Sequence, residues 1–161
     1  MSAGSAVKVR LKRPGWLAPT TLVLSVLGLL DAAYLTYEHY TGSTSLACSE
    51  TAHVNCTRVT TSQWSELAGI PVALLGLLFF IAMTVLCLPV VWRRAPGYVQ
   101  QLRLGGAAVG LLMVFYLLWA EFFKIHAICL WCTGVHIITF VLLIVLVVGE
   151  IFSHYDVDDG A

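Results

Sequence analysis

The stretch "AICLWCTGVHIITFVLLIVLVVG", residues 127–149, combines a cysteine pair with a long apolar run. Cys129 and Cys132 form a Cys-x-x-Cys motif, and the residues that follow include no Lys, Arg, Asp or Glu. About twenty apolar residues suffice for a helix to cross ~30 Å of hydrocarbon at ~1.5 Å per residue. The stretch therefore predicts a membrane-spanning helix that begins with a redox-type motif.

The composition of the whole chain agrees with this interpretation. Of its 161 residues, 59% are hydrophobic and 11% are charged, whereas about 25% are charged in a typical soluble domain. The net charge is zero, and the basic residues form no concentrated patch, so the sequence does not support nucleic-acid binding. We therefore expect a protein that resides in a lipid bilayer.

Four apolar runs are each long enough to span a membrane, at residues 16–37, 69–92, 104–123 and 128–149. The first run follows basic residues, as a signal peptide would, but it is too long and a poor cleavage site follows it. Because backbone groups in lipid must be hydrogen-bonded internally, these runs predict helices. We expect an all-α membrane protein with one domain, a four-transmembrane-helix bundle with a long loop at 38–68.

The distribution of Lys and Arg predicts the orientation. These residues are concentrated before the first run and between the second and third runs, at Lys8, Arg10, Lys12, Arg13, Arg93, Arg94 and Arg103. The long loop has only Arg58 and the last short connection has only Lys124. Because cytoplasmic loops are enriched in Lys and Arg, we expect cytoplasmic termini and an extracytoplasmic loop.

This topology brings four of the five cysteines to one face. Cys48 and Cys56 belong to the long loop, and Cys129 and Cys132 begin the fourth helix on the same side, where disulfides are stable. Cys87 would lie roughly 27 Å down the second helix. We therefore expect Cys87 to be the unpaired thiol, a small buried residue.

The two cysteine pairs differ in their expected chemistry. Cys129 and Cys132 lie three residues apart at a helix N-terminus, which places them on one face and stabilises a thiolate. Cys48 and Cys56 lie eight residues apart in a polar, flexible segment. They could form a local disulfide, or Cys56 could swing to reach Cys129, because exchange needs only a thiolate, an accessible disulfide and mobility.

The order of motifs is specific. A loop cysteine pair, "NCTRVTTSQWSELAGIPVALLGLLFF" and "WAEFFKIHAICLWC" follow one another. This order resembles the vitamin K epoxide reductase family, in particular its bacterial branch, over roughly residues 16–149. The resemblance implies a four-helix membrane oxidoreductase that reduces a quinone with electrons from thiols.

The resemblance also implies roles for the cysteines. Cys132 would adjoin the quinone, and Cys129 would exchange with Cys56. Cys48 would meet the redox partner. Ser62 matches a serine or threonine that the family has after the loop pair, near a short half-helix that we expect at "SQWSEL".

The same resemblance implies the partners. We expect a membrane quinone, menaquinone or ubiquinone, as electron acceptor, and a separate secreted thioredoxin-like protein as donor, since no fused thioredoxin-like domain follows the fourth run. The location would be the bacterial inner membrane, where the activity supports disulfide formation. Vertebrate members have a tyrosine four residues after the last active cysteine. His136 stands there in this chain, which favours simple quinone reduction over epoxide reduction.

Further residues are candidates for contacts with the quinone or for proton transfer. His136 lies one turn after Cys132 and could form a hydrogen bond with a quinone carbonyl. We expect Ser62 and aromatic residues to complete the pocket, mainly Phe115, Trp119 and Phe122. Asp31, about 9 Å below the outer surface, is a candidate proton relay because intramembrane carboxylates are costly. We expect Glu121 and Lys124 to form an interfacial ion pair.

Three other functions are compatible with parts of the pattern. A metal-binding membrane protein could use six Cys and His side chains, Cys48, His53, Cys56, His126, Cys129 and Cys132, although the spacing of the loop pair fits poorly. An unrelated four-helix family of quinone-coupled oxidases also uses two cysteine pairs, but in the reverse order. A structural subunit with disulfide-stabilised loops predicts that Cys129→Ala or Cys132→Ala leaves function intact.

Overall fold

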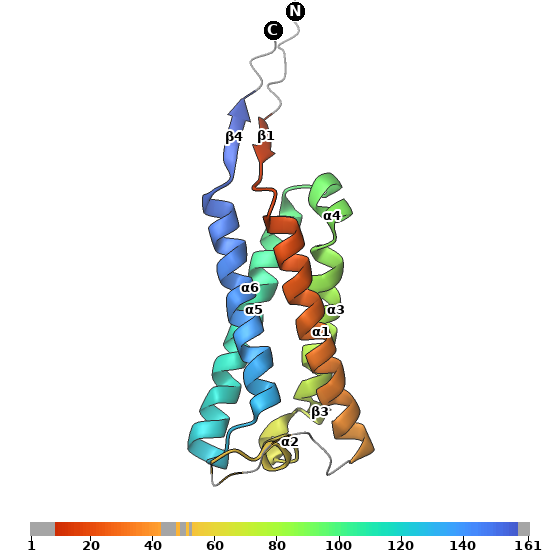
Figure 1. Ribbon diagram of the computed structural model, residues 1–161, viewed down its shortest axis with the longest axis vertical. Helices are drawn as coiled ribbons and strands as arrows, with labels where there is room; N and C mark the ends of the chain where they lie inside the picture. The colour runs from red at the N-terminus through yellow and green to blue at the C-terminus, as the bar shows by residue number, and fades with distance from the viewer. Residues whose placement is uncertain (1–8, 43–47, 49–50, 52, 158–161) are drawn as a thin grey trace, which may run out of the picture.

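A bundle of four apolar helices forms the body of the protein. The computed structural model describes residues 9–42, 48, 51 and 53–157. The four helices, which run side by side in Figure 1, are α1 (Leu17–Thr41), α3 (Val72–Leu86), α5 (Tyr98–Ala120) and α6 (Leu130–Ile151). Three segments, α1, α6 and Tyr98–Ile125, are long and apolar enough to cross a membrane, and α3 is a shorter apolar helix. The expected all-α membrane bundle is confirmed.

Small residues let the helices approach closely. Gly28 of α1 packs against the fully buried ring of Phe80 in α3, and a Cβ atom at position 28 would collide with that ring. Gly149 of α6 lies in the same way against Leu17 of α1. Such contacts between small residues and neighbouring helices are typical of bundles in lipid, where apolar burial alone gives little driving force.

The second apolar run is broken into two helices. We expected one span over 69–92, but α3 ends at Leu86, and α4 (Pro89–Arg94) follows after a break. Pro89 stands at the first position of α4 and lacks the N–H that a continuous helix needs. Arg103 of α5 donates hydrogen bonds to the Leu86 carbonyl from Nε at 2.9 Å and from Nη2 at 2.7 Å. The Leu86 carbonyl at the end of α3 therefore has a hydrogen-bond donor in place of the next helical N–H.

The third helix is longer than the expected span of 104–123. It begins at Tyr98 and continues through η2, a π-helical turn at Glu121–Ile125. Arg103 therefore lies within α5. It is 1% exposed and stacks on the ring of Trp92, with its guanidinium carbon 3.6 Å from the ring centroid. A charged residue that we placed outside the span is therefore part of the packed bundle.

Two short ribbons add to the helices. Strands β1 (Val9–Lys12) and β4 (His154–Val157) pair antiparallel beyond α1 and α6, at the end of the bundle where α4 lies (Figure 1). Strands β2 (Glu66–Leu67) and β3 (Ile70–Pro71) form a tight hairpin before α3, with Gly69 at a φ of 78°. We expected neither ribbon, because both are too short to show a strand periodicity.

The opposite end of the bundle is covered by the long loop. It contains α2 (Cys56–Thr60) and the 3-10 turn η1 (Gln63–Ser65). Only Gln63–Ser65 of the expected half-helix "SQWSEL" is helical, and the longer helical segment begins earlier, at Cys56. The cause is Asn55, which caps α2 by accepting a hydrogen bond from the Arg58 N–H at 2.7 Å.

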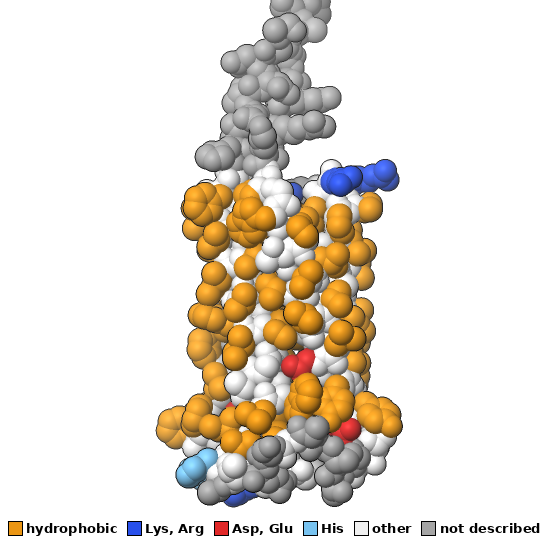
Figure 2. Space-filling model, in the orientation of Figure 1, with side chains coloured by type: hydrophobic (Ala, Val, Ile, Leu, Met, Phe, Trp, Pro, Cys, Tyr) orange, Lys and Arg blue, Asp and Glu red, His pale blue; other side chains and the backbone are white. Residues whose placement is uncertain are grey.

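The outer surface is that of a membrane protein. Hydrophobic side chains cover most of the face of the bundle in Figure 2, and Lys and Arg side chains gather at the end where α4 lies. Leu112 and Ile151 are examples of large apolar residues on the surface, at 68% and 71% exposed. Apolar patches of this extent mark a surface that another apolar phase covers. The chain is a multi-pass membrane protein.

Candidate functional site

The start of α6 presents the first cysteine pair. Cys129 is the N-cap residue, in an extended conformation, and its sulfur accepts a hydrogen bond from the Cys132 N–H at 3.2 Å. Cys129 and Cys132 form a disulfide, with their Cα atoms 5.2 Å apart. Cys129 is fully buried and Cys132 is half-buried. The unpaired N–H groups of this helix end favour negative charge on the sulfur atoms when the disulfide is reduced.

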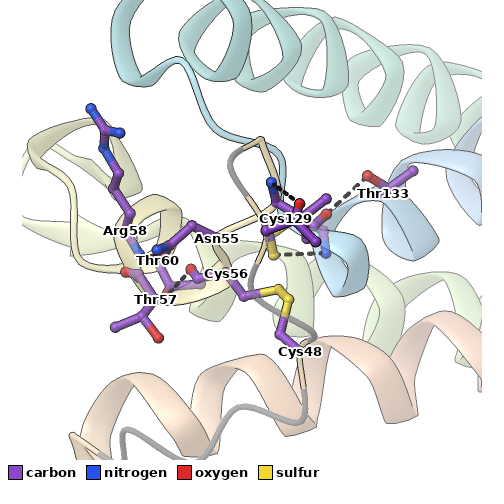
Figure 3. Close-up of a disulfide and its surroundings, with 11 residues drawn as sticks. Cys48, Asn55, Cys56, Thr57, Arg58, Thr60, Cys129 and Thr133 are labelled. Carbon is purple, nitrogen blue, oxygen red and sulfur yellow. Dashed lines mark hydrogen bonds between the residues drawn. A yellow bond between two sulfur atoms is a disulfide. The ribbon is translucent and has the colours of Figure 1, made fainter.

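The second pair is the local disulfide between Cys48 and Cys56, with Cα atoms 6.2 Å apart (Figure 3). This is one of the two pairings that the sequence left open. Cys56 is the first residue of α2 and is fully buried, whereas Cys48 is half-buried. We had expected Cys56 to lie in a flexible polar segment. It lies instead in a short helix.

A short backbone clamp holds the two pairs together. The Ile128 N–H donates to the His53 carbonyl at 2.9 Å, and the Asn55 N–H donates to the Ile128 carbonyl at 3.0 Å. The residue before Cys129 is thus bonded on both sides to the residues before Cys56. Cys56 and Cys129 also share one buried apolar cluster, and Figure 3 shows them on adjoining segments. The geometry joins the loop cysteines to the helix cysteines.

A cavity of about 370 Å³ lies beside Cys132, which forms part of its wall. Its walls are almost wholly apolar and come from α1, α3, α5, α6 and the loop. Chemically distinctive residues in these walls are His39, Ser62, Trp64, Phe79, Phe80, Glu121, Cys132 and His136. A mostly apolar cavity of this size with a few polar groups is typical of a site for a small organic molecule.

Two of the five expected quinone contacts line this cavity. His136 is 5% exposed, and its Nδ1 has no hydrogen-bond partner among the described residues. Ser62 also lines the cavity, and its Oγ donates to the Val59 carbonyl at 2.9 Å.

The other three expected contacts, Phe115, Trp119 and Phe122, are exposed on the outer face of α5 and η2 and lie outside the cavity lining. The rotation of α5 explains their position. Gly110, Met113, Leu117 and Glu121 recur at helical spacing and face the cavity, so residues 115, 119 and 122 point elsewhere. Trp119 instead packs edge-on against Trp64, with ring centroids 5.4 Å apart.

Glu121 is the residue whose place we misjudged most. It is 2% exposed, lines the cavity and accepts a hydrogen bond from the backbone N–H of Cys129. The expected ion pair with Lys124 is absent from the described residues, since Lys124 lies over the rings of Trp64 and Trp119. A lone acidic residue inside an apolar run was the signal that could have identified it.

Two further residues lie outside the cavity lining. The Asp31 carboxylate faces Gly134 of α6, where a Cβ atom would be 2.7 Å from Oδ2. Its Oδ1 is buried without a hydrogen-bond partner among the described residues. Cys87 is a buried free thiol at the α4 end of the bundle, as we expected.

The arrangement of the side chains also bears on the alternative of a metal site. Within residues 9–42, 48, 51 and 53–157, no group of three or more His, Cys, Asp and Glu side chains is placed to hold a metal ion. His53 and His126 are exposed, whereas Cys56 and Cys129 are buried.

A comparison with protein-family models identifies the chain. The model described as "Vitamin K epoxide reductase family" matches residues 19–147. The match covers most of the chain, all four bundle helices to within a few residues of their ends, and both cysteine pairs. Together with the two adjoining disulfides at one end of a membrane bundle, it settles the assignment. The protein belongs to the vitamin K epoxide reductase family and is a membrane oxidoreductase that acts on thiols and disulfides.

Proposed function

We propose that the protein carries electrons from a secreted thioredoxin-like protein, through Cys48 and Cys56 and then Cys129 and Cys132, to a membrane quinone. The observation that supports this most strongly is the clamp at Ile128, which keeps the loop pair beside the helix pair. Cys132, the partner of Cys129, lines the apolar cavity. Contact between the two pairs on one side and a cavity beside Cys132 on the other supports the proposed order of transfers.

The first step is reduction of the loop disulfide. A thiolate of the partner attacks Cys48, which is the less buried of the two sulfur positions, and Cys56 leaves as a thiolate. The second thiol of the partner then attacks the partner sulfur that is bonded to Cys48. The partner leaves as a disulfide, and Cys48 is freed as a thiol. Two electrons and two protons now reside on Cys48 and Cys56.

The second step moves these electrons inward. The Cys56 thiolate attacks Cys129, and Cys132 leaves as a thiolate that the N-terminus of α6 stabilises. Cys48 then attacks Cys56, so the loop disulfide forms again and Cys129 is released. Because both Cys56 and Cys129 are buried, soluble thiols have poor access to this transfer.

The third step reduces the quinone to the quinol. The two thiols give up two electrons and two protons, and their disulfide forms again. The cavity suits a quinone ring because its walls are apolar and it is large enough for a small ring system. His136, one turn after Cys132, lines this cavity and would donate a hydrogen bond to a carbonyl of the substrate. Menaquinone and ubiquinone both fit this description.

The proposed location is the inner membrane of a bacterium, where the activity supports disulfide formation in secreted proteins. Arg93 and Arg94 lie at the α4 end, and Arg13 stacks on Trp92 at that same end. The positive-inside rule therefore supports cytoplasmic termini and cysteine pairs on the extracytoplasmic face.

The decisive experiment measures quinone reduction by the purified protein with a reduced thioredoxin-like donor. We expect Cys132→Ser to abolish turnover and Cys87→Ser, the matched control, to leave it unchanged. Cys48→Ser should impair turnover with the protein donor more than turnover with a small dithiol, which can attack the half-buried Cys132. Normal turnover by Cys132→Ser would refute the proposal.

A further inference from the structure

Glu121 is a buried carboxyl group that the relay described above does not use. It is 2% exposed, although acidic side chains are rarely buried without a compensating role. One of its oxygens accepts the Cys129 N–H, while Oε2 is buried without a hydrogen-bond partner among the described residues. One oxygen of the carboxyl group therefore lies beside a reacting cysteine, and the other has no hydrogen-bond partner among the described residues.

The backbone also singles out this residue. Glu121 begins η2, the π-helical turn that ends α5, and its carbonyl accepts the Ala127 N–H at 3.3 Å. Such widened turns occur often at functional sites. Among the described residues, the titratable side chains that line the cavity are His39, Glu121, Cys132 and His136. Glu121 supplies the only carboxyl group of these four.

Quinone reduction requires a proton path that the cysteines alone do not provide. For the Cys129–Cys132 disulfide to form again, the Cys129 thiol must lose its proton, and the quinone oxygens must gain two protons. Cys129 is fully buried, so water is not available beside it as a base. The nitrogen that donates to Glu121 is separated from the Cys129 sulfur by only three covalent bonds.

We propose that Glu121 transfers this proton. As the two sulfur atoms join and their electron pair passes to the quinone, the Glu121 carboxylate takes the proton of the Cys129 thiol. The resulting carboxylic acid gives this proton to one oxygen of the reduced quinone, and the proton from Cys132 goes to the other oxygen. The carboxylate is then restored, so no additional oxidant or reductant is needed. The inference rests on the proposed function, because it assigns a residue to the quinone step of that relay.

Glu121→Gln separates this role from a structural one. Glutamine keeps an oxygen that can accept the Cys129 N–H, but it cannot carry the proton. General acid–base groups contribute about 10²–10⁴-fold, so we expect kcat for quinone reduction to fall at least about tenfold, with an unchanged KM for the quinone. Glu121→Asp should recover part of the lost kcat. Glu150→Gln, at the other end of α6, is the matched control and should behave as wild type.

A second measurement needs no quinone. Reduction of the Cys129–Cys132 disulfide by the thioredoxin-like donor is followed by thiol alkylation and mass spectrometry. We expect Glu121→Gln to match wild type in this half-reaction, because the proposed proton transfer belongs to the later step. A Glu121→Gln variant with wild-type kcat, or one that slows the half-reaction as much as turnover, would overturn the inference while leaving the relay in place. Turnover by Cys132→Ser would overturn both.

Discussion

At the scale of single residues, the exposure of the four paired cysteines supports the proposed direction of electron transfer. Cys56 and Cys129 are fully buried, whereas Cys48 and Cys132 are half-buried, and Cys132 lines the cavity. An external thiol therefore meets Cys48 first, and a molecule in the cavity meets Cys132 first. The two buried sulfur atoms communicate only with each other and with their own partners.

This arrangement predicts which cysteines pair when their partners are removed. In the double variant Cys48→Ser/Cys132→Ser, Cys56 and Cys129 lose their disulfide partners but remain in one buried cluster. We expect them to form a disulfide with each other, detected by mass spectrometry of a non-reduced digest. In the matched double variant Cys48→Ser/Cys129→Ser, Cys56 and Cys132 should pair much less. Equal yields would show that the clamp does not select the pair.

His136 carries a second prediction at this scale. Its buried Nδ1 lacks a partner among the described residues, so a quinone carbonyl would satisfy a group whose unpaired burial costs about 1–3 kcal/mol. We expect His136→Phe to raise the KM for quinone about tenfold, since ~1.4 kcal/mol corresponds to that factor. Reduction of the Cys129–Cys132 disulfide by the donor should not change. An unaltered KM would remove His136 from the binding site.

The residues that sequence reasoning placed wrongly share a physical cause. In lipid, the outer face of a helix is as apolar as its inner face, so hydrophobic periodicity does not reveal which residues point inward. Phe115 and Met113 look equivalent in the sequence, yet only Met113 lines the cavity. The cysteine pairs, His136 and Ser62 were identifiable because their chemistry, order and spacing carry information that hydropathy does not.

At the scale of whole elements, the approximate positions of the helices could be predicted and their breaks could not. Run lengths located α1 and α6 within a few residues of their ends. The break between α3 and α4 lies inside one continuous apolar run, where Pro89 was the only local signal. The π-helical turn after α5 depends on backbone bonding near Cys129, which no side-chain pattern encodes.

The contact between α1 and α3 supplies a prediction at this scale. A Cβ atom at Gly28 collides with the ring of Phe80, whereas a Cβ atom at Gly105 of α5 meets no other atom within 4 Å. We expect Gly28→Ala to lower the free energy of unfolding by about 1–3 kcal/mol through overpacking. Gly105→Ala, the control, should be neutral or stabilising because alanine favours helix. Thermal unfolding in detergent compares them, and equal Tm values would contradict the close contact.

The junction of α3, α4 and α5 supplies another. Arg103 satisfies the Leu86 carbonyl and stacks on Trp92. Arg103→Met should leave that carbonyl unpaired, at a cost of about 1–3 kcal/mol, and lower the Tm. The exposed Arg93 provides the control, since Arg93→Met removes a charge at the same end without a buried partner. If both variants unfold at the wild-type temperature, Arg103 does not stabilise the break.

At the scale of the whole molecule, the two ends of the bundle differ in composition. The α4 end holds the β1–β4 ribbon and most of the described basic residues, while the opposite end holds both disulfides. The apolar cavity adjoins this second end, since Cys132 and residues of the loop line it. A thiol partner in water and a lipid-soluble acceptor can therefore react with the same protein without meeting each other.

Single-cysteine labelling in intact bacterial cells tests this orientation directly. In a variant with all five native cysteines replaced by serine, Thr61→Cys introduces a thiol at the loop end and Arg94→Cys introduces one at the α4 end, both at exposed positions. Because the basic end should be cytoplasmic, a membrane-impermeant maleimide should label position 61 in intact cells and position 94 only after lysis. The reverse pattern would place both cysteine pairs in a reducing compartment, where their disulfides would have no extracytoplasmic partner to oxidise.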